Sequence, residues 1–257
     1  MNYFDVFGQK KTVFAMLHLK GDNRQDILER TKREIEIYLS NEINAMVVEN
    51  YFGSENEVEE ILRFMQKDYP DVLYGVNMLD NDAGGFEAAG KYGAKFIQLD
   101  SVAGHLEPEE DERFDLNISQ WRKNTNAVVL GGVRFKYQPY KSGRPLDEDL
   151  KIGLRRCDAI VVTGSGTGVE TELSKITEFR SIIGGFPLIV GAGITPENCE
   201  ERLSIVDGAI IGSYFKDTYK DNGEVDAGHV KKIMDVVKEI NKKKLQEAGE
   251  AGVCRLA

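Results

Sequence analysis

The sequence predicts an α/β fold, a single-domain TIM (β/α)8 barrel, and two observations carry this prediction. Short apolar runs recur eight times along 257 residues, and longer charged stretches separate them. The runs are continuous rather than alternating, which is typical of strands buried on both faces of a parallel sheet. Such barrels take about 250 residues in one domain. A doubly wound open sheet is the alternative, disfavoured because no glycine-rich dinucleotide turn follows the first strand.

The eight apolar runs give the expected strands in order. They cover residues 13–17, 45–48, 72–76, 95–99, 127–133, 159–162, 188–190 and 209–211. The segments between them are predicted helices. The barrel is expected to occupy residues 1–245, and residues 246–257 are expected to form a C-terminal tail.

The predicted helices carry start signals and apolar faces. Residues 22–40 place apolar side chains at helical spacing. Ser54 and Glu57 form a capping box that opens the next helix. Thr195 is an N-cap followed by proline at the first helical position. The last helix is expected over about residues 226–245, with its apolar side chains turned inward.

Composition excludes several classes of protein. Lysine and arginine number 33 against 43 aspartate and glutamate, and this net charge of −10 argues against a nucleic-acid-binding surface. No apolar run approaches the length of a membrane span, and no signal peptide is recognised, so a cytoplasmic protein is expected. The three cysteines are far apart without a CxxC pair, so neither a disulfide framework nor a zinc site is indicated.

Candidate catalytic residues follow the predicted strands, because the active site of such a barrel lies at the carboxyl ends of its strands. Glu49, Asp82 and Asp100 are candidates for a general base or for Mg²⁺ ligation through oxygen. Asp82 has an alternative role as the cap of the following helix. Lys136 is suited to Schiff-base formation, carbonyl polarisation or anion binding, and also to an ion pair at the mouth. His18 is suited to proton transfer or to a structural hydrogen bond.

Glycine-rich segments after the last strands predict a phosphate site. Their glycines let the backbone approach a ligand closely, and N–H groups at a short helix start hold anions. The alternative is that these glycines only permit tight turns. A similar loop after the sixth strand is either an anion-binding nest, a lid or a simple hinge. The candidates are Gly191, Gly193, Gly212 and Ser213 after the last two strands, and Gly164 and Ser165 after the sixth.

A P-loop is disfavoured. Residues 85–91 match most of its pattern, but Tyr92 stands where serine or threonine must hold Mg²⁺. The segment is instead predicted as part of the third helix. No HExxH or Ser-His-Asp pattern is present, so nothing supports hydrolysis by zinc or by a serine nucleophile.

Several motifs occur in an order that is typical of a known family. They read FAMLHL at 14–19, VENYFG at 48–53, GVNMLDNDA at 75–83, GGVRFKYQP at 131–139, IVVTG at 160–164 and GITPEN at 193–198. Together they resemble the BtpA family, which includes SgcQ-like bacterial proteins. The resemblance implies a TIM barrel with a phosphate-binding end. It leaves the activity open, because the family takes its name from a protein linked to photosystem I biogenesis, whereas SgcQ-like members look like partners of sugar-phosphate metabolism.

Two functions are therefore expected. The first is an enzyme acting on a small phosphorylated metabolite, a sugar phosphate or nucleotide-derived compound, by isomerase, lyase or transferase chemistry. In it the glycine loops hold the phosphate, a carboxylate moves a proton, with or without Mg²⁺, and Lys136 stabilises negative charge. The second is a non-catalytic assembly or scaffold factor for a protein complex. Fold alone decides neither, and a homo-oligomer is the default expectation.

Overall fold

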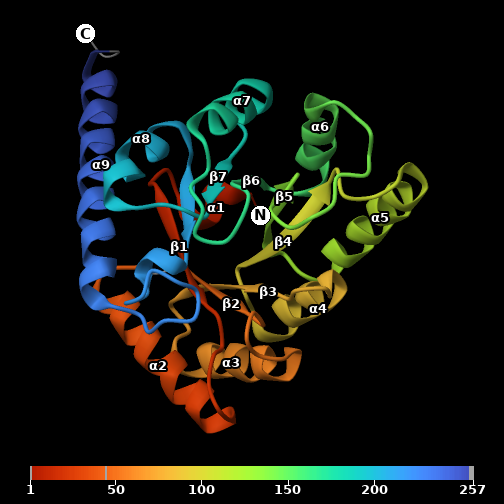
Figure 1. The fold of residues 1–257 in the computed structure, drawn as a ribbon. Helices are drawn as coiled ribbons and strands as arrows, with labels where there is room; N and C mark the ends of the chain where they lie inside the picture. Colours follow the sequence, from red (N-terminus) through yellow and green to blue (C-terminus); the bar gives the residue numbers. More distant parts are fainter. Residues whose placement is uncertain (1, 44, 255–257) are drawn as a thin grey trace.

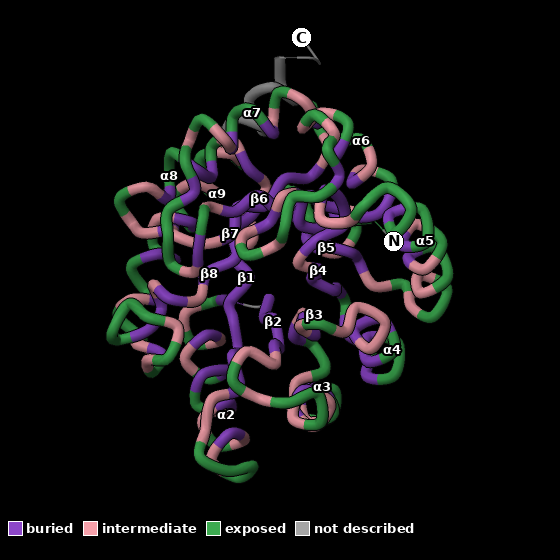
Figure 2. The backbone as a smooth tube through the Cα atoms, turned by 45° about the vertical axis from the view of Figure 1, so that its right-hand side comes forward, coloured by how far each residue is buried: buried purple, intermediate pink, exposed green. Residues whose placement is uncertain are grey.

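The computed structural model describes residues 2–43 and 45–254, and for residues 247–254 it describes the backbone only. Eight parallel strands form a closed barrel in chain order, with β8 paired to β1 (Figure 1). The predicted TIM barrel is confirmed. Helices form an outer ring around the buried strands, as the burial colours of Figure 2 show. Within the described part of the chain, no helix is both long and apolar enough to cross a membrane.

The strands match the predicted runs to within one residue at each end, with one exception. β4 continues beyond Leu99 to Ala103, and its register with β5 shifts between these two residues. Asp100 therefore lies inside a strand rather than after one. The strands are β1 Thr12–Leu17, β2 Ala45–Glu49, β3 Leu73–Asn77, β4 Phe96–Ala103, β5 Val128–Val133, β6 Ala159–Thr163, β7 Leu188–Gly191 and β8 Gly208–Ile211.

The helices begin where the sequence places their caps. Ser54 and Glu57 form the expected capping box of α3, and Thr195 forms one with Asn198 at the start of α8. The helices are α1 Tyr3–Phe7, α2 Arg24–Ser40, α3 Glu55–Asp68, α4 Asp82–Tyr92, α5 Pro108–Trp121, α6 Leu146–Arg156, α7 Leu173–Ile183, α8 Pro196–Ile205 and α9 Ala227–Cys254, with short 3-10 turns η1 Arg122–Asn124 and η2 Ser213–Phe215. α9 runs on through the expected tail as far as residue 254.

The short helix α1 closes one end of the barrel and was not predicted. Its Tyr3 and Phe7 are buried, and the Phe7 ring lies 5.0 Å from that of Phe14 and 5.5 Å from that of Phe96. These rings belong to the apolar cluster inside the barrel. Because Phe96 is the first residue of β4, α1 lies at the amino ends of the strands. The opposite end, where the carboxyl ends meet, remains available for a site.

Candidate active site

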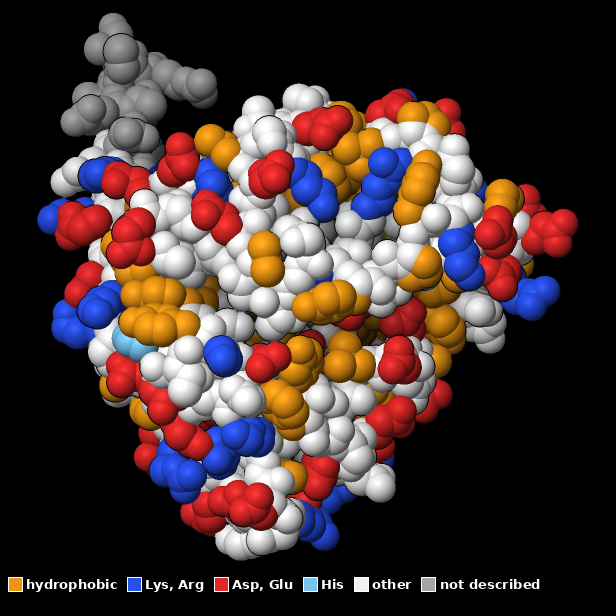
Figure 3. Space-filling model, viewed as in Figure 1, with side chains coloured by type: hydrophobic (Ala, Val, Ile, Leu, Met, Phe, Trp, Pro, Cys, Tyr) orange, Lys and Arg blue, Asp and Glu red, His pale blue; other side chains and the backbone are white. Residues whose placement is uncertain are grey.

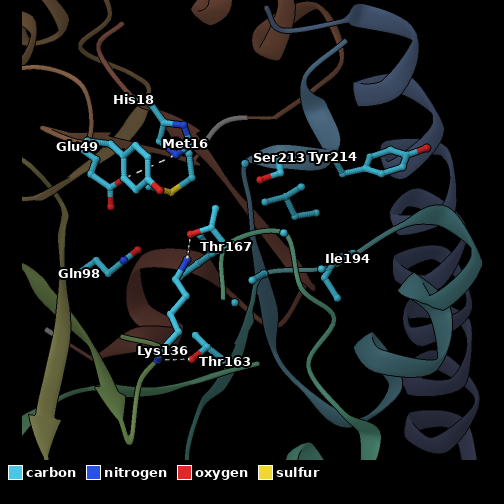
Figure 4. Close-up of a pocket in the computed structure, with 18 of the residues that line it drawn as sticks. Met16, His18, Glu49, Gln98, Lys136, Thr163, Thr167, Ile194, Ser213 and Tyr214 are labelled. Carbon is cyan, nitrogen blue, oxygen red and sulfur yellow. Dashed lines mark hydrogen bonds and ion pairs between the residues drawn. The ribbon is translucent and has the colours of Figure 1, made fainter. Parts of the chain in front are cut away.

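A cavity of about 800 Å³ lies at the carboxyl ends of the strands (Figure 4). Eight of the predicted site residues line it, and they come from six of the eight strand ends. On the face seen in Figure 3, apolar side chains gather around a hollowed centre. Tyr137 and Tyr219, both lining residues, are more than half exposed. The eight residues that meet in the cavity are His18, Glu49, Asp100, Lys136, Gly191, Gly193, Gly212 and Ser213.

Three predicted residues do not line the cavity, namely Asp82, Gly164 and Ser165. Neighbouring residues take their places. Asp80, which has a positive φ of 64°, lines the cavity ahead of α4. The α4 cap is Asn81, whose side chain accepts a hydrogen bond from the Gly84 N–H, so the alternative role of Asp82 as the cap is wrong. After β6, the lining residues are Thr163, Thr167 and Gly168.

A pair of carboxyl groups, buried Glu49 and half-buried Asp100, lies on the β2–β4 side of the cavity. Asn77 Nδ2 donates to Glu49 Oε1 at 2.7 Å and to Asp100 Oδ1 at 3.1 Å. Glu49 and Asn77 are directly opposite each other in the β2–β3 register, so the sheet itself brings them together. Gln98, two residues before Asp100 on β4, points inward as well and donates weakly to Asp100 at 3.4 Å. One amide thus links two acidic side chains.

Burial sets the protonation of this pair. Loss of water and, next, the nearby Asp100 charge raise the pKa of Glu49 to about 8, against the opposing effects of Lys136 and Asn77. Burial also raises the pKa of Asp100, although the hydrogen bonds from Asn77 and Gln98 oppose this. Glu49 therefore holds a proton at neutral pH, which suits a general acid.

His18 stays neutral beside Glu49. Its Nε2 lies 3.6 Å from Glu49 Oε2, and its ring stacks on Tyr51 with the centroids 4.9 Å apart. Burial, followed by the positive charge of Lys216, lowers the pKa of His18 to about 4. Its Nδ1 lies 3.3 Å from the Asp221 carbonyl oxygen, in the loop after η2. At neutral pH His18 and Glu49 thus meet as two uncharged groups rather than as an ion pair.

Lys136 reaches across the cavity from the end of β5, as Figure 4 shows. Its backbone N–H donates to Thr163 Oγ1 at 2.9 Å, and its Nζ donates to Thr167 Oγ1 at 3.0 Å. Arg134, the first residue after β5, turns away and pairs with Asp149 at 3.0 Å. The ammonium of Lys136 therefore rests on a neutral hydroxyl, where it can reach a ligand's negative charge.

The loops after β6, β7 and β8 converge beside Lys136. Gly193 has a φ of +70°, and a Cβ there would lie 2.2 Å from the Glu170 Cα, so only glycine fits. Gly168 likewise has positive φ, and a Cβ there would lie 3.3 Å from Ser213 Oγ. Ser213 and Tyr214 open η2, so their N–H groups have no carbonyl partner within that turn. This wall of the cavity presents hydrogen-bond donors.

The geometry does not assemble the Mg²⁺ ligands considered from the sequence. Among the residues that the structure describes, no three His, Cys, Asp or Glu side chains are grouped closely enough to hold a metal ion. Asp82 begins α4 outside the cavity, and burial, with the charges of Asp100 and Asp80, raises its pKa to about 6. Glu49 and Asp100 are instead held together by Asn77.

Gln98 and Asp221 were not singled out by sequence reasoning. Gln98 carries a recognisable signal, because it is a polar residue between Ile97 and Leu99 in an otherwise apolar strand. Asp221 carries none, because its role depends on how the loop after η2 folds back. There its carboxylate accepts a hydrogen bond from the Tyr51 hydroxyl at 2.9 Å.

The family of the chain follows from comparison with known proteins. The model of the BtpA family matches residues 9–239. The chain belongs to the BtpA family. It is 25% identical to an uncharacterised protein of Methanocaldococcus jannaschii, with 90% of this chain and 97% of that protein covered. It is 23% identical to the putative sgc region protein SgcQ of Escherichia coli (93% and 98% covered) and 22% identical to the photosystem I biogenesis protein BtpA of Synechocystis (93% and 92% covered).

Solved structures with the same fold include several enzymes. The 3-hexulose-6-phosphate synthase of Salmonella typhimurium superposes with a TM-score of 0.61 at 14% identity, covering 89% of this chain and 99% of that one. Phosphoribosylanthranilate isomerase of Pyrococcus furiosus gives 0.58 at 18% identity, with 89% and 99% covered. Thiamine phosphate pyrophosphorylase of the same organism gives 0.59 at 16%, with 90% and 98% covered. At such identities the likeness shows the fold alone.

Proposed function

We propose that this BtpA-family protein is an enzyme that binds a small phosphorylated metabolite and moves a proton on it, in isomerase, lyase or transferase chemistry. The observation that carries the proposal is that one cavity joins a pair of carboxyl groups, a lysine and three glycine-rich loops. A structural barrel end needs no such combination. Perturbed carboxyl groups inside a cavity are typical of catalytic sites.

The phosphate is proposed to bind on the donor wall. Gly193, Gly212 and the N–H and hydroxyl groups of Ser213 surround the anion there, and Gly191 lets the chain turn at the end of β7. The Lys136 ammonium lies on the same side, hydrogen-bonded to Thr167. Backbone N–H groups suit this task in an acidic protein because they attract an anion only at short range.

The remainder of the substrate then extends toward β2–β4. Glu49 donates a proton there because it is protonated at neutral pH, and Asp100 is the candidate base of the pair. Lys136 stabilises the negative charge that develops on an oxygen during proton transfer. The names of the solved structures support this proposal, because the synthase, the isomerase and the pyrophosphorylase are each named for a phosphorylated or phosphoribosyl compound.

The Ser213→Asp variant tests the phosphate site. A ligand at about one hundred times its Kd should raise the free energy of unfolding of the wild type by about 2.7 kcal/mol. A thermal-shift panel of inorganic phosphate, sugar phosphates and nucleotides, with and without Mg²⁺, measures this. We expect Ser213→Asp to abolish the shift by charge repulsion. Gly193 is unsuitable for the test, because any side chain there collides with the backbone of Glu170.

The matched control is Ser204→Asp, which adds the same charge at an exposed position of α8. It should retain the full shift. The proposal fails if no phosphorylated compound stabilises the wild type, or if both variants respond alike.

The second candidate is a non-catalytic assembly factor, which the name of the Synechocystis relative favours. It predicts that phosphorylated compounds do not stabilise the protein and that Glu49 and Lys136 can be replaced without loss of function. The same thermal-shift panel therefore separates the two candidates. The expected homo-oligomer stays a prediction, which light scattering of the purified chain tests.

A further inference from the structure

Gln98 holds an unpaired hydrogen-bond acceptor in the wall of the cavity. The residue is 4% exposed and lines the cavity from β4. Its Oε1 is buried, and within the described part of the chain it has no hydrogen-bond partner. Buried acceptors without a donor destabilise the folded state, so each one calls for an explanation.

The orientation of this carboxamide is fixed by its neighbour. Gln98 Nε2 donates to Asp100 Oδ1 at 3.4 Å. Exchanging the two ends of the amide would place Oε1 against the carboxylate oxygen, so two acceptors would face each other. The oxygen must therefore point away from Asp100. In Figure 4 the end of the Gln98 side chain points toward the part of the cavity between Glu49 and Lys136.

The cavity is polarised between two walls. The wall built by β5 to β8 presents donors, namely the Lys136 ammonium, the Ser213 hydroxyl and the start of η2. The wall built by β2 to β4 presents oxygen acceptors from Asp100 and from Gln98. A ligand that satisfies both walls carries an anion at one end and hydrogen-bond donors at the other.

We propose that the substrate is the phosphate ester of a polyhydroxylated compound, and that Gln98 Oε1 accepts a hydrogen bond from one of its hydroxyl groups. The inference deepens the proposed function and rests on it, because the phosphate end fixes which part of the ligand reaches β4. Gln98 is then a specificity-determining residue. It rejects ligands that lack the hydroxyl because they leave its acceptor unpaired.

A hydroxyl fits this wall better than an ammonium group does. Lys136 already supplies a positive charge that acts on both Glu49 and Asp100. Glu49 is neutral at neutral pH, so the wall does not hold two uncompensated negative charges. A neutral donor therefore completes the hydrogen bonding without adding a second buried cation.

Isothermal titration calorimetry with three probes tests the inference. The probes are inorganic phosphate, pentyl phosphate and ribitol 5-phosphate, and the last two match in carbon number but differ in hydroxyl groups. We expect the wild type to bind ribitol 5-phosphate at least about tenfold more tightly than pentyl phosphate. Gln98→Met, which keeps the length of the side chain, should reduce this ratio to below about threefold. Its Kd for inorganic phosphate should not change.

Gln66→Met, at an exposed position of α3, is the matched control and should keep the full ratio. Thermal melting gives a second readout. Gln98→Met removes a buried unpaired oxygen and loses only a weak hydrogen bond of 3.4 Å to Asp100, so the ligand-free variant should melt at the same temperature as the wild type or at a higher one. A stable variant with lost discrimination separates recognition from folding.

The outcomes are distinct. The inference is overturned if Gln98→Met keeps the wild-type ratio, or if the wild type binds phosphate yet does not prefer the polyol ester. Tighter binding of 5-aminopentyl phosphate than of ribitol 5-phosphate would overturn the choice of a hydroxyl. If no probe binds, inorganic phosphate included, the proposed function falls together with this inference.

Discussion

Burial favours the neutral form of two side chains at the site, Glu49 and His18. Glu49 keeps its proton to about pH 8, and His18 remains unprotonated down to about pH 4. The sequence indicates both residues and places each of them just after a strand, although Glu49 is the last residue of β2. It cannot give their protonation, which depends on Asp100, Lys136 and Lys216 from distant parts of the chain. Sequence therefore predicts which residues meet, and the packing decides what each of them does.

A consequence at this scale is a pH dependence of stability. The unfolded chain loses the Glu49 proton near pH 4.5, whereas the folded protein keeps it to about pH 8. The stability that this group contributes is complete below pH 4.5 and is lost as pH rises to about 8. The slope of the free energy of unfolding approaches −1.4 kcal/mol for each pH unit, about one proton. Glu49→Gln should flatten this slope.

Urea unfolding between pH 6.5 and 8 measures the effect. His18 contributes stability that is lost as pH falls from 6.5 toward 4, so it adds little in this window, and the Asp82 contribution ends near pH 6. Glu112→Gln, at an exposed position of α5, should leave the wild-type slope unchanged. A wild-type slope in the Glu49→Gln variant would contradict the raised pKa.

Among the elements, the strands could be predicted from the sequence, whereas helix α1, which closes the amino-terminal end of the barrel, could not. Strands buried on both faces read as continuous apolar runs, so their ends are visible in the sequence. The five residues of α1 are too few to show helical periodicity, and only their contacts with Phe14 and Phe96 reveal their role. The extension of β4 also escaped prediction, because polar residues such as Asp100 and Ser101 mark a strand end in most sequences.

The packing of α1 against the inside of the barrel leads to a prediction about stability. Phe7→Ala removes a buried ring that packs against two others inside the barrel, so the free energy of unfolding should fall by about 3 kcal/mol. Chemical denaturation measures this loss. Leu116→Ala, at a position of α5 that is 71% exposed, should change stability by less than about 0.5 kcal/mol. Equal effects of the two variants would show that α1 does not close the barrel.

For the whole molecule, the net negative charge repels a phosphate, whereas the groups that line the proposed site attract one. A chain of charge −10 repels a phosphate at long range, so the proposed site must attract it through short-range donors. The sequence predicted the charge, the barrel and the end that carries the cavity. It could not show that Arg134 turns away to Asp149 and leaves Lys136 as the cation after β5 that faces the cavity.

The dependence of phosphate affinity on salt concentration tests whether short-range donors outweigh the repulsion by the net charge. Added salt screens the overall repulsion, with a Debye length of about 10 Å at 0.1 M, and hardly affects donors in contact with the ligand. The Kd for inorganic phosphate should therefore stay constant or fall between about 20 and 200 mM salt. Calorimetry in chloride and in acetate separates screening from competition by the added anion. A tenfold loss of affinity in both salts would indicate a basic surface site instead.

Helix α1, which closes the amino-terminal end of the barrel, also affects how substrate and product enter and leave the proposed enzyme. Tyr3 and Phe7 belong to the apolar cluster that fills the amino-terminal end of the barrel, and the residues that line the cavity lie at the carboxyl-terminal end. Product therefore leaves from the same end of the barrel at which substrate enters, and it does not pass through the barrel to the other end. Product that still carries the phosphate therefore competes directly with the next substrate, and its release sets an upper limit on the rate.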